Sequence, residues 1–134
     1  MPFLWHPLVV HFPLALWLTS FLFDLLYART SERFYAVASR YLIGLGVAGA
    51  LVAVLTGFVD YRPLVAQGIG QAFVDQHGLH SWLAYAATVL YAGIFILRWR
   101  GRAMAKGAYL TMAAAGAVLI AVTGYLGGEI RRVM

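Results

Sequence analysis

Four long apolar segments, separated by polar ones, dominate the pattern along the chain. They cover about residues 3–27, 34–59, 77–99 and 107–127. A helix needs about 20 residues to cross the hydrocarbon core of a bilayer, so each segment is long enough. Backbone groups in lipid must pair within their own segment, which favours helices. The pattern therefore predicts an all-α fold, a four-helix transmembrane bundle that forms one domain over residues 1–134.

The segment between the second and third apolar runs, residues 61–76, is too polar and too short to cross. One interpretation is a short helix on the membrane surface that begins at Pro63, because proline suits the first turn of a helix. The other interpretation is an ordinary loop. Both keep this connection on one side of the membrane.

The two halves of the chain resemble each other. The segment from Val10 to Ala15 matches the segment from Leu79 to Ala84, with His11 opposite His80. Glycines near the ends of the second and fourth runs match as well: Gly49 with Gly116, and Gly57 with Gly124. Chance similarity between apolar sequences is the alternative. The repeat predicts two parallel-repeated helical hairpins, related by an axis along the membrane normal.

Composition supports a membrane protein. Apolar residues make up 63% of the chain and charged residues 11%, whereas soluble domains are roughly half apolar and a quarter charged. Lipid is therefore an expected partner. The net charge of +5 is carried by cations beside the apolar segments, which indicates membrane topology rather than nucleic-acid binding. The absence of cysteine excludes disulfides, iron–sulfur clusters and covalently attached haem.

The distribution of lysine and arginine predicts the orientation. Seven such residues flank the first and third connections: Arg29, Arg33, Arg40, Arg98, Arg100, Arg102 and Lys106. Three lie on the opposite side: Arg62, Arg131 and Arg132. Because cytoplasmic connections carry the excess of positive charge, both termini and the middle connection are expected outside.

One acidic residue, Asp24, lies inside the first apolar segment near its cytoplasmic end. A lone charge within a membrane span is costly and usually has a partner. We therefore expect Arg29 or Arg98 to neutralise Asp24.

All four histidines lie near the outer side of the predicted bundle. A histidine inside a membrane span is a candidate for function and usually faces the bundle interior. His11 and His80 lie deeper and match in the repeat, so we expect them to face each other. His6 and His77 are shallower, secondary candidates. A structural imidazole that bonds to a backbone carbonyl or to interfacial water is the alternative for each.

Two imidazoles from two helices of a bundle are typical of a b-type haem site. His11 and His80 are therefore the predicted axial ligands. Small residues would let the flat macrocycle pass close to the second and fourth helices: Gly49, Gly57, Gly116 and Gly124. Ordinary packing between membrane helices also produces such small residues. Arg62 lies on the same side and could bind haem propionates, or it is a solvated surface charge.

A second interpretation uses all four histidines together. An imidazole cluster suits copper or zinc, and convergence of the helix ends would let His6, His11, His77 and His80 form one site. The cytoplasmic half of the bundle contains no histidine. A haem at each surface is therefore not expected, and the prediction is one cofactor near the outer face.

The run from His6 to Leu16, His-Pro-Leu-Val-Val-His-Phe-Pro-Leu-Ala-Leu, resembles the opening signature of a family of bacterial four-helix membrane proteins of unknown function. Thr56 to Tyr61 and Thr123 to Gly128 are similar to its later motifs. The resemblance marks His6, His11 and a third-span histidine, a role for which His77 and His80 compete. Some relatives accompany redox modules such as Rieske-type domains. The resemblance therefore implies a cytochrome b-like electron-transfer protein in the bacterial inner membrane, with periplasmic termini.

The sequence as a whole predicts a membrane cytochrome with one haem b near the periplasmic face. It would exchange electrons with a quinol or a periplasmic redox protein, and is more an electron-transfer protein than a stand-alone enzyme. The alternative is a non-haem subunit, copper- or zinc-binding or structural, of a larger membrane complex. The small-residue stripes also suit a homodimer.

Overall fold

The computed structural model describes residues 5–68, 70–101 and 105–132, and all of its regular structure is helical. The helices are α1 (His6–Val9), α2 (His11–Thr30), α3 (Arg33–Ala66), α4 (Gln71–Trp99) and α5 (Lys106–Arg132). Together, α1 and α2 form one candidate span, and α3, α4 and α5 each supply another. The predicted four-helix bundle is thereby confirmed. The predicted start of the first span at residue 3 and the cation Arg102 lie outside the described residues.

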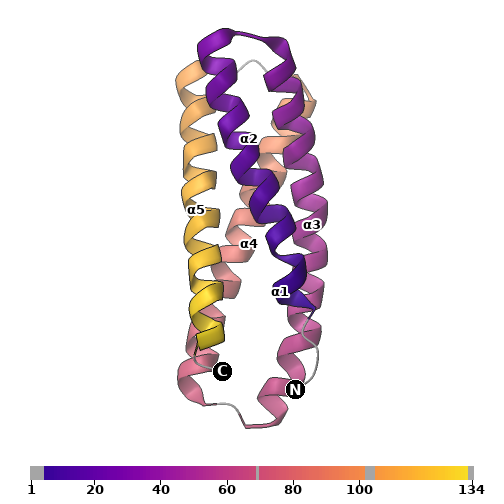
Figure 1. Ribbon diagram of the computed structural model, residues 1–134, viewed down its shortest axis with the longest axis vertical. Helices are drawn as coiled ribbons and strands as arrows, with labels where there is room; N and C mark the ends of the chain where they lie inside the picture. The colour runs from indigo at the N-terminus through magenta and orange to yellow at the C-terminus, as the bar shows by residue number, and fades with distance from the viewer. Residues whose placement is uncertain (1–4, 69, 102–104, 133–134) are drawn as a thin grey trace.

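The helices form a ring in chain order around a long central axis (Figure 1). Helix α2 packs against α3 and α5, and α4 packs against the same two helices, so α2 and α4 face each other across the centre. We call the end that holds His6, His77 and His80 the histidine end; the α3–α4 connection and the C-terminal end of α5 lie there. The opposite end, with Asp24 and Arg98, is the ion-pair end.

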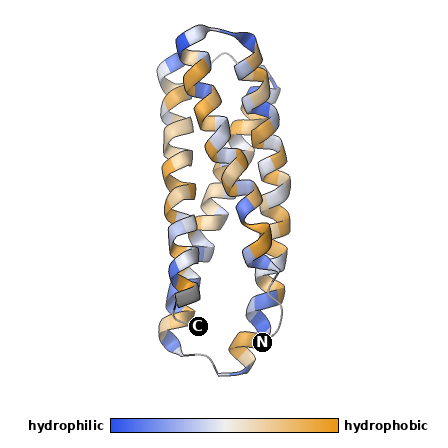
Figure 2. Ribbon diagram, viewed as in Figure 1, coloured by the Kyte–Doolittle hydropathy of each residue, from blue (hydrophilic) through white to orange (hydrophobic). Residues whose placement is uncertain are grey.

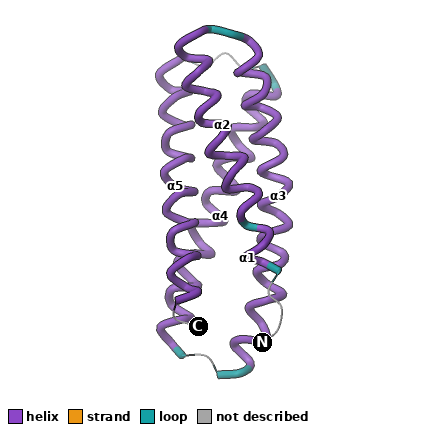
Figure 3. Tube along the Cα trace, viewed as in Figure 1, coloured by secondary structure: helices purple, strands orange, loops and turns teal. Residues whose placement is uncertain are grey.

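The first span contains a break that the apolar pattern does not reveal. Helix α1 ends at Val9 and α2 begins at His11, with a short non-helical segment between them (Figure 3). Pro13 has no amide hydrogen, so the carbonyl of Val9 loses its partner one turn later. His6 and His11 are five residues apart, which on a helix turns their side chains about 140° from each other.

The connection between α3 and α4 is much shorter than the sequence suggests. Helix α3 continues through Pro63 to Ala66 and α4 begins at Gln71, so neither a surface helix nor a long loop spans residues 61–76. The cause lies in packing between the two extended ends. The ring of Tyr61 stacks on that of His77 at 3.9 Å and lies 6.2 Å from that of Phe73. This contact lengthens both helices beyond the apolar segments.

Most large apolar side chains face outward, as expected for a bundle in lipid. Figure 2 shows hydrophobic residues along the middle of the long helices and hydrophilic ones mostly toward the two ends. Leu22, Leu55, Val89 and Val118 are each more than half exposed. The bundle interior is built instead from small residues and a few aromatic rings.

The centre of that interior is a stack of two aromatic rings. Trp17 of α2 and Tyr91 of α4 lie with centroids 4.0 Å apart and planes within 9°. Gly46 of α3 lies against the Trp17 indole, and a methyl group there would overlap its nitrogen. Gly116 of α5 lies against Tyr91, and an added Cβ would approach the Tyr91 Cζ to 2.9 Å. Each glycine makes room for one ring of the stack.

The contact between Trp17 and Tyr91, like that between Asp24 and Arg98, pairs a position of the first half with one of the second. The register of this pairing differs from the register of the repeat predicted from the sequence. Asp24 and Arg98 are 74 residues apart, and Trp17 and Tyr91 have the same separation. On α3 and α5 the equivalent positions are 70 residues apart, as for Gly46 and Gly116.

In this register the equivalent of His80 is His6, not His11, and the equivalent of Gly116 is Gly46, not Gly49. Sequence similarity misplaced the repeat because neighbouring turns of apolar helices are so alike. Burial identifies the register better, since Pro13 and its equivalent Ala87 are both buried.

Candidate functional site

A cavity of about 360 Å³ lies inside the histidine end. Residues from all five helices line it, and all four histidines are among them. Its other walls are largely apolar and include Leu14, Leu64 and Ile120. The site is therefore an apolar hollow within membrane spans, with imidazoles as its main polar groups.

His6 enters this cavity from α1 and is fixed by two contacts. Its backbone N–H donates to Asp60 Oδ2 at 2.7 Å, and its ring Nδ1 lies 2.7 Å from the carbonyl oxygen of Ala53. The ring lies on Gly57, where an added Cβ would approach Nδ1 to 3.2 Å. A carbonyl oxygen only accepts, so Nδ1 carries the proton and Nε2 keeps a free lone pair.

His80 enters from α4 and is held in the same way. Its Nδ1 lies 3.1 Å from the carbonyl oxygen of Thr123, and its ring packs on Gly127. Ala53 and Thr123 are equivalent in the structural register, as are Gly57 and Gly127. The two imidazoles therefore have equivalent carbonyl anchors, equivalent glycine platforms and the same tautomer.

The two equivalent rings lie close together across the bundle. Their centroids are 6.1 Å apart and their planes are at 83°. Two imidazoles that bind one metal ion from opposite sides have centroids about 6 Å apart, because each metal–nitrogen bond is about 2 Å. A histidine ligand also typically donates its other ring N–H to a carbonyl. The centroid distance and the carbonyl contacts of Nδ1 are thus those of a pair of axial ligands.

The other two histidines occupy different surroundings. The ring of His77 lies 6.5 Å from that of His80, stacked on Tyr61, and its Nδ1 is 3.3 Å from Ser81 Oγ. His11 lines the cavity, but its side chain is exposed. Among the described residues, no ring contact or hydrogen bond joins His11 to another histidine.

The remaining residues expected at the site divide into two groups. Gly57 and Gly124 line the cavity. Gly49 and Gly116 do not, because Phe12 and Tyr91 of the protein itself lie against them. Arg62 is exposed on α3 and does not line the cavity. Packing between helices therefore accounts for Gly49 and Gly116.

The described residues do not form a multi-ligand metal centre. No group of three or more histidine, aspartate or glutamate side chains among them is placed to hold a metal ion. A structural zinc site usually has four protein ligands. The four histidines share one cavity, but within the described residues they do not converge on one point.

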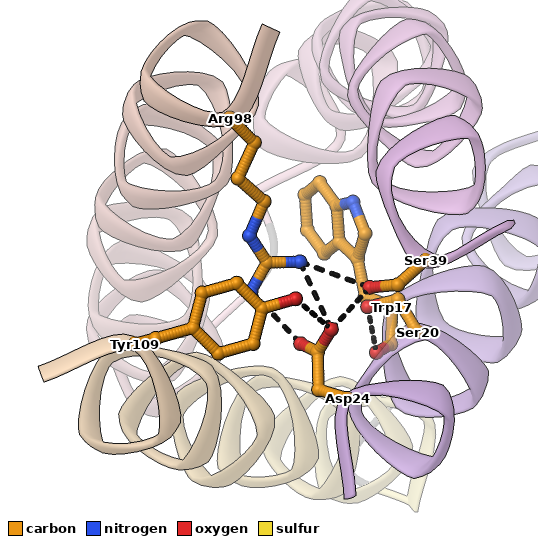
Figure 4. Close-up of polar contacts among 6 residues, drawn as sticks. All are labelled: Trp17, Ser20, Asp24, Ser39, Arg98 and Tyr109. Carbon is orange, nitrogen blue, oxygen red and sulfur yellow. Dashed lines mark hydrogen bonds and ion pairs between the residues drawn. The ribbon is translucent and has the colours of Figure 1, made fainter. Parts of the chain in front are cut away.

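A second polar cluster lies at the ion-pair end (Figure 4). Arg98 forms a bidentate pair with Asp24, with Nη2–Oδ2 at 2.9 Å and Nη1–Oδ1 at 3.1 Å. The hydroxyls of Ser39 and Tyr109 each donate to Asp24 Oδ1 at 2.6 Å. The expectation that Arg98 neutralises Asp24 is confirmed, whereas Arg29 has no part in the pair.

The sequence does not predict several of these contacts. Ser39 and Tyr109 were not expected near Asp24, and Ala53 and Thr123 were not expected to bind histidines. Ser39 and Tyr109 occupy equivalent positions in the structural register. This equivalence can be recognised only once the pairing of the helices is known.

Comparison with known proteins gives one match. The family model described as "Predicted membrane protein (DUF2231)" matches residues 4–133. No curated protein and no solved structure is similar enough to match. The family description agrees with the four candidate spans.

Proposed function

The chain belongs to the DUF2231 family of predicted membrane proteins, and from that premise we propose that it binds one haem b and transfers electrons. We assign His6 and His80 as the axial ligands. This pair replaces the pair His11 and His80 expected from the sequence. The haem would lie at the histidine end, which the charge distribution favours as the periplasmic side of a bacterial inner membrane.

The observation that carries the proposal is the equivalence of the two imidazoles. Each is anchored through Nδ1 to a backbone carbonyl, and their centroids are 6.1 Å apart. Neither Nε2 has a hydrogen-bond partner among the described residues, and both rings line the cavity. One metal ion between the rings would satisfy both at once.

The surrounding residues suit a flat, largely apolar cofactor. The cavity walls are mostly apolar, and Gly124 and Gly128 supply surface without side chains. When bound, a haem supplies reversible one-electron chemistry. The protein's residues would hold it, exclude water and set its potential. The expected electron partner is a membrane quinol or a redox protein on the periplasmic side.

An absorption spectrum of the purified protein, expressed with ample haem, tests the proposal. We expect a Soret band and sharp α and β bands after reduction. His6→Ala and His80→Ala should abolish them, whereas His11→Ala should leave them in place as the matched control. A colourless protein would overturn the proposal. Loss of the bands in His11→Ala with retention in His6→Ala would instead support the pair expected from the sequence.

A further inference from the structure

A second hollow adjoins the histidines between α3 and α4. Its volume is about 240 Å³, and it shares His6, His77 and His80 with the first cavity. Phe58, Ser81 and Tyr85 line only this second hollow. The histidine pair therefore stands between an inner cavity and a side pocket, which we call the α3–α4 pocket.

The α3–α4 pocket has flat aromatic walls. Phe58 and Tyr85 lie with centroids 6.4 Å apart and planes within 19°, and Tyr61 stacks on His77 with planes within 13°. Phe58 is 50% exposed, and Trp82, beside Tyr85, is 73% exposed. Exposed aromatic side chains on membrane spans face lipid. A ligand would therefore enter from the bilayer and lie between flat faces.

The polar side chains of this pocket are the three histidines, Ser81, and the tyrosines Tyr61 and Tyr85. The Ser81 hydroxyl donates to the His77 carbonyl oxygen at 2.8 Å, so its oxygen can accept from His77 Nδ1 at 3.3 Å. With the His77 proton on Nδ1, Nε2 keeps its lone pair, and no described residue donates to that Nε2. A ligand hydroxyl that reaches Nε2 would find an acceptor there.

We propose that the α3–α4 pocket binds the aromatic headgroup of a membrane quinol, with one hydroxyl donating to His77 Nε2. This inference rests on the proposed function, for which it names the electron donor. A lipid acyl chain has neither a ring nor a hydrogen-bonding group. A quinol has a flat ring, two hydroxyls and a lipid-soluble tail. It matches the aromatic walls, the His77 lone pair and the entry from lipid.

A photoreactive probe tests the pocket directly. The probe is a decyl benzoquinol with a diazirine beside the ring, applied to the purified protein in lipid nanodiscs and mapped by mass spectrometry. We expect labels on the ends of α3 and α4, between residues 58 and 85. Unlabelled decyl benzoquinol should displace the probe at a several-fold lower concentration than the oxidised quinone.

Two variants and one control sharpen this test. His77→Ala removes the acceptor and should weaken displacement roughly three- to tenfold, the range for one hydrogen bond. Ser81→Ala removes the hydroxyl beside His77 Nδ1, so the ring proton can lie on either nitrogen. Displacement should therefore weaken roughly twofold by the same reasoning. Val118→Ala, at an exposed position of α5 that lines neither hollow, is the control and should leave displacement unchanged. Elution of each variant as a single species in gel filtration shows that it is folded.

The outcomes separate this inference from the proposed function. Labels elsewhere, labels equally displaced by a decyl lipid chain, or equal binding to wild type and His77→Ala would each overturn the quinol pocket. The labels are read by mass and need no haem. A colourless protein with specific labels would therefore overturn the haem proposal alone, and a haem-loaded protein without labels would overturn the quinol pocket alone.

Discussion

The two ends of the bundle differ in how their polar side chains find partners inside the membrane. At the ion-pair end, Asp24, Ser39, Arg98 and Tyr109 come from four different helices and pair with one another. At the histidine end, His6, His77 and His80 use only Nδ1 within the described protein. Polar groups in lipid must find partners. A closed network therefore indicates a structural role, whereas an open one indicates a ligand.

Packing around the polar groups differs between the two ends as well. Both the cavity and the α3–α4 pocket lie at the histidine end. At the ion-pair end, the side chain of Asp24 is 1% exposed and the Arg98 guanidinium lies 4.0 Å from the centre of the Tyr109 ring. Mutations at the ion-pair end should therefore change mainly stability, and mutations at the histidine end mainly ligand binding.

The largest expected effect comes from breaking the ion pair. Asp24→Asn leaves the buried Arg98 charge without a counter-charge, which typically costs about 3–5 kcal/mol. The free energy of unfolding in mixed micelles with increasing dodecyl sulfate measures this loss. Glu32→Gln, at an exposed position next to α3, is the control and should change little. A loss below about 1 kcal/mol for Asp24→Asn would show that the ion pair contributes little to the free energy of unfolding.

A smaller loss is expected at the centre of the bundle, between the two ends. Gly46→Ala places a methyl group against the Trp17 indole, and such overpacking costs about 1–3 kcal/mol. Gly93→Ala is the matched control, because nothing lies within 4 Å of its added Cβ. It should be neutral or gain up to about 1 kcal/mol from helix propensity. Equal unfolding midpoints for the two variants would contradict the close contact.

The third prediction addresses the histidine end without its ligand. In protein prepared without haem, His80→Ala should lower the free energy of unfolding by only about 1 kcal/mol, because one hydrogen bond to Thr123 is lost. The same unfolding assay compares it with Asp24→Asn. A loss as large as that of Asp24→Asn would mean that the two ends do not differ in role.

The smallest effect is expected when the whole ion pair is replaced. Asp24→Leu combined with Arg98→Met removes both charges, and such apolar replacements are often close to neutral. Ser39 can then bond to a carbonyl of its own helix. Stability within about 1 kcal/mol of wild type is expected, with the haem spectrum unchanged. A greater loss than in Asp24→Asn alone would show that the cluster does more than neutralise charge.

The fold was predictable because membrane spans are defined by length and apolarity, which the sequence displays directly. The ends of α3 and α4 were not, because the stack of Tyr61 on His77 is a tertiary contact. The neutralisation of Asp24 by Arg98 followed from the cost of a lone buried charge. Its hydroxyl partners did not, since serine and tyrosine near a span end have many equally good positions.

At the site, the presence of histidines near one end was predictable and their pairing was not. His6 is held inward by Asp60 and the Ala53 carbonyl, tertiary contacts that no apolar pattern records. The His11 expectation relied on the depth of His11 in its span and on its match to His80 in the repeat. The structure instead pairs His6 with His80.

The ion pair has a further consequence for assembly. Asp24 and Arg98 occupy equivalent positions of two similar hairpins. If two copies of the first hairpin met in place of the correct partners, aspartate would face aspartate, and two copies of the second would bring arginine against arginine. Like charges in lipid repel strongly and lack counter-ions. One complementary pair thus favours the packing of two unlike hairpins over the packing of two like ones.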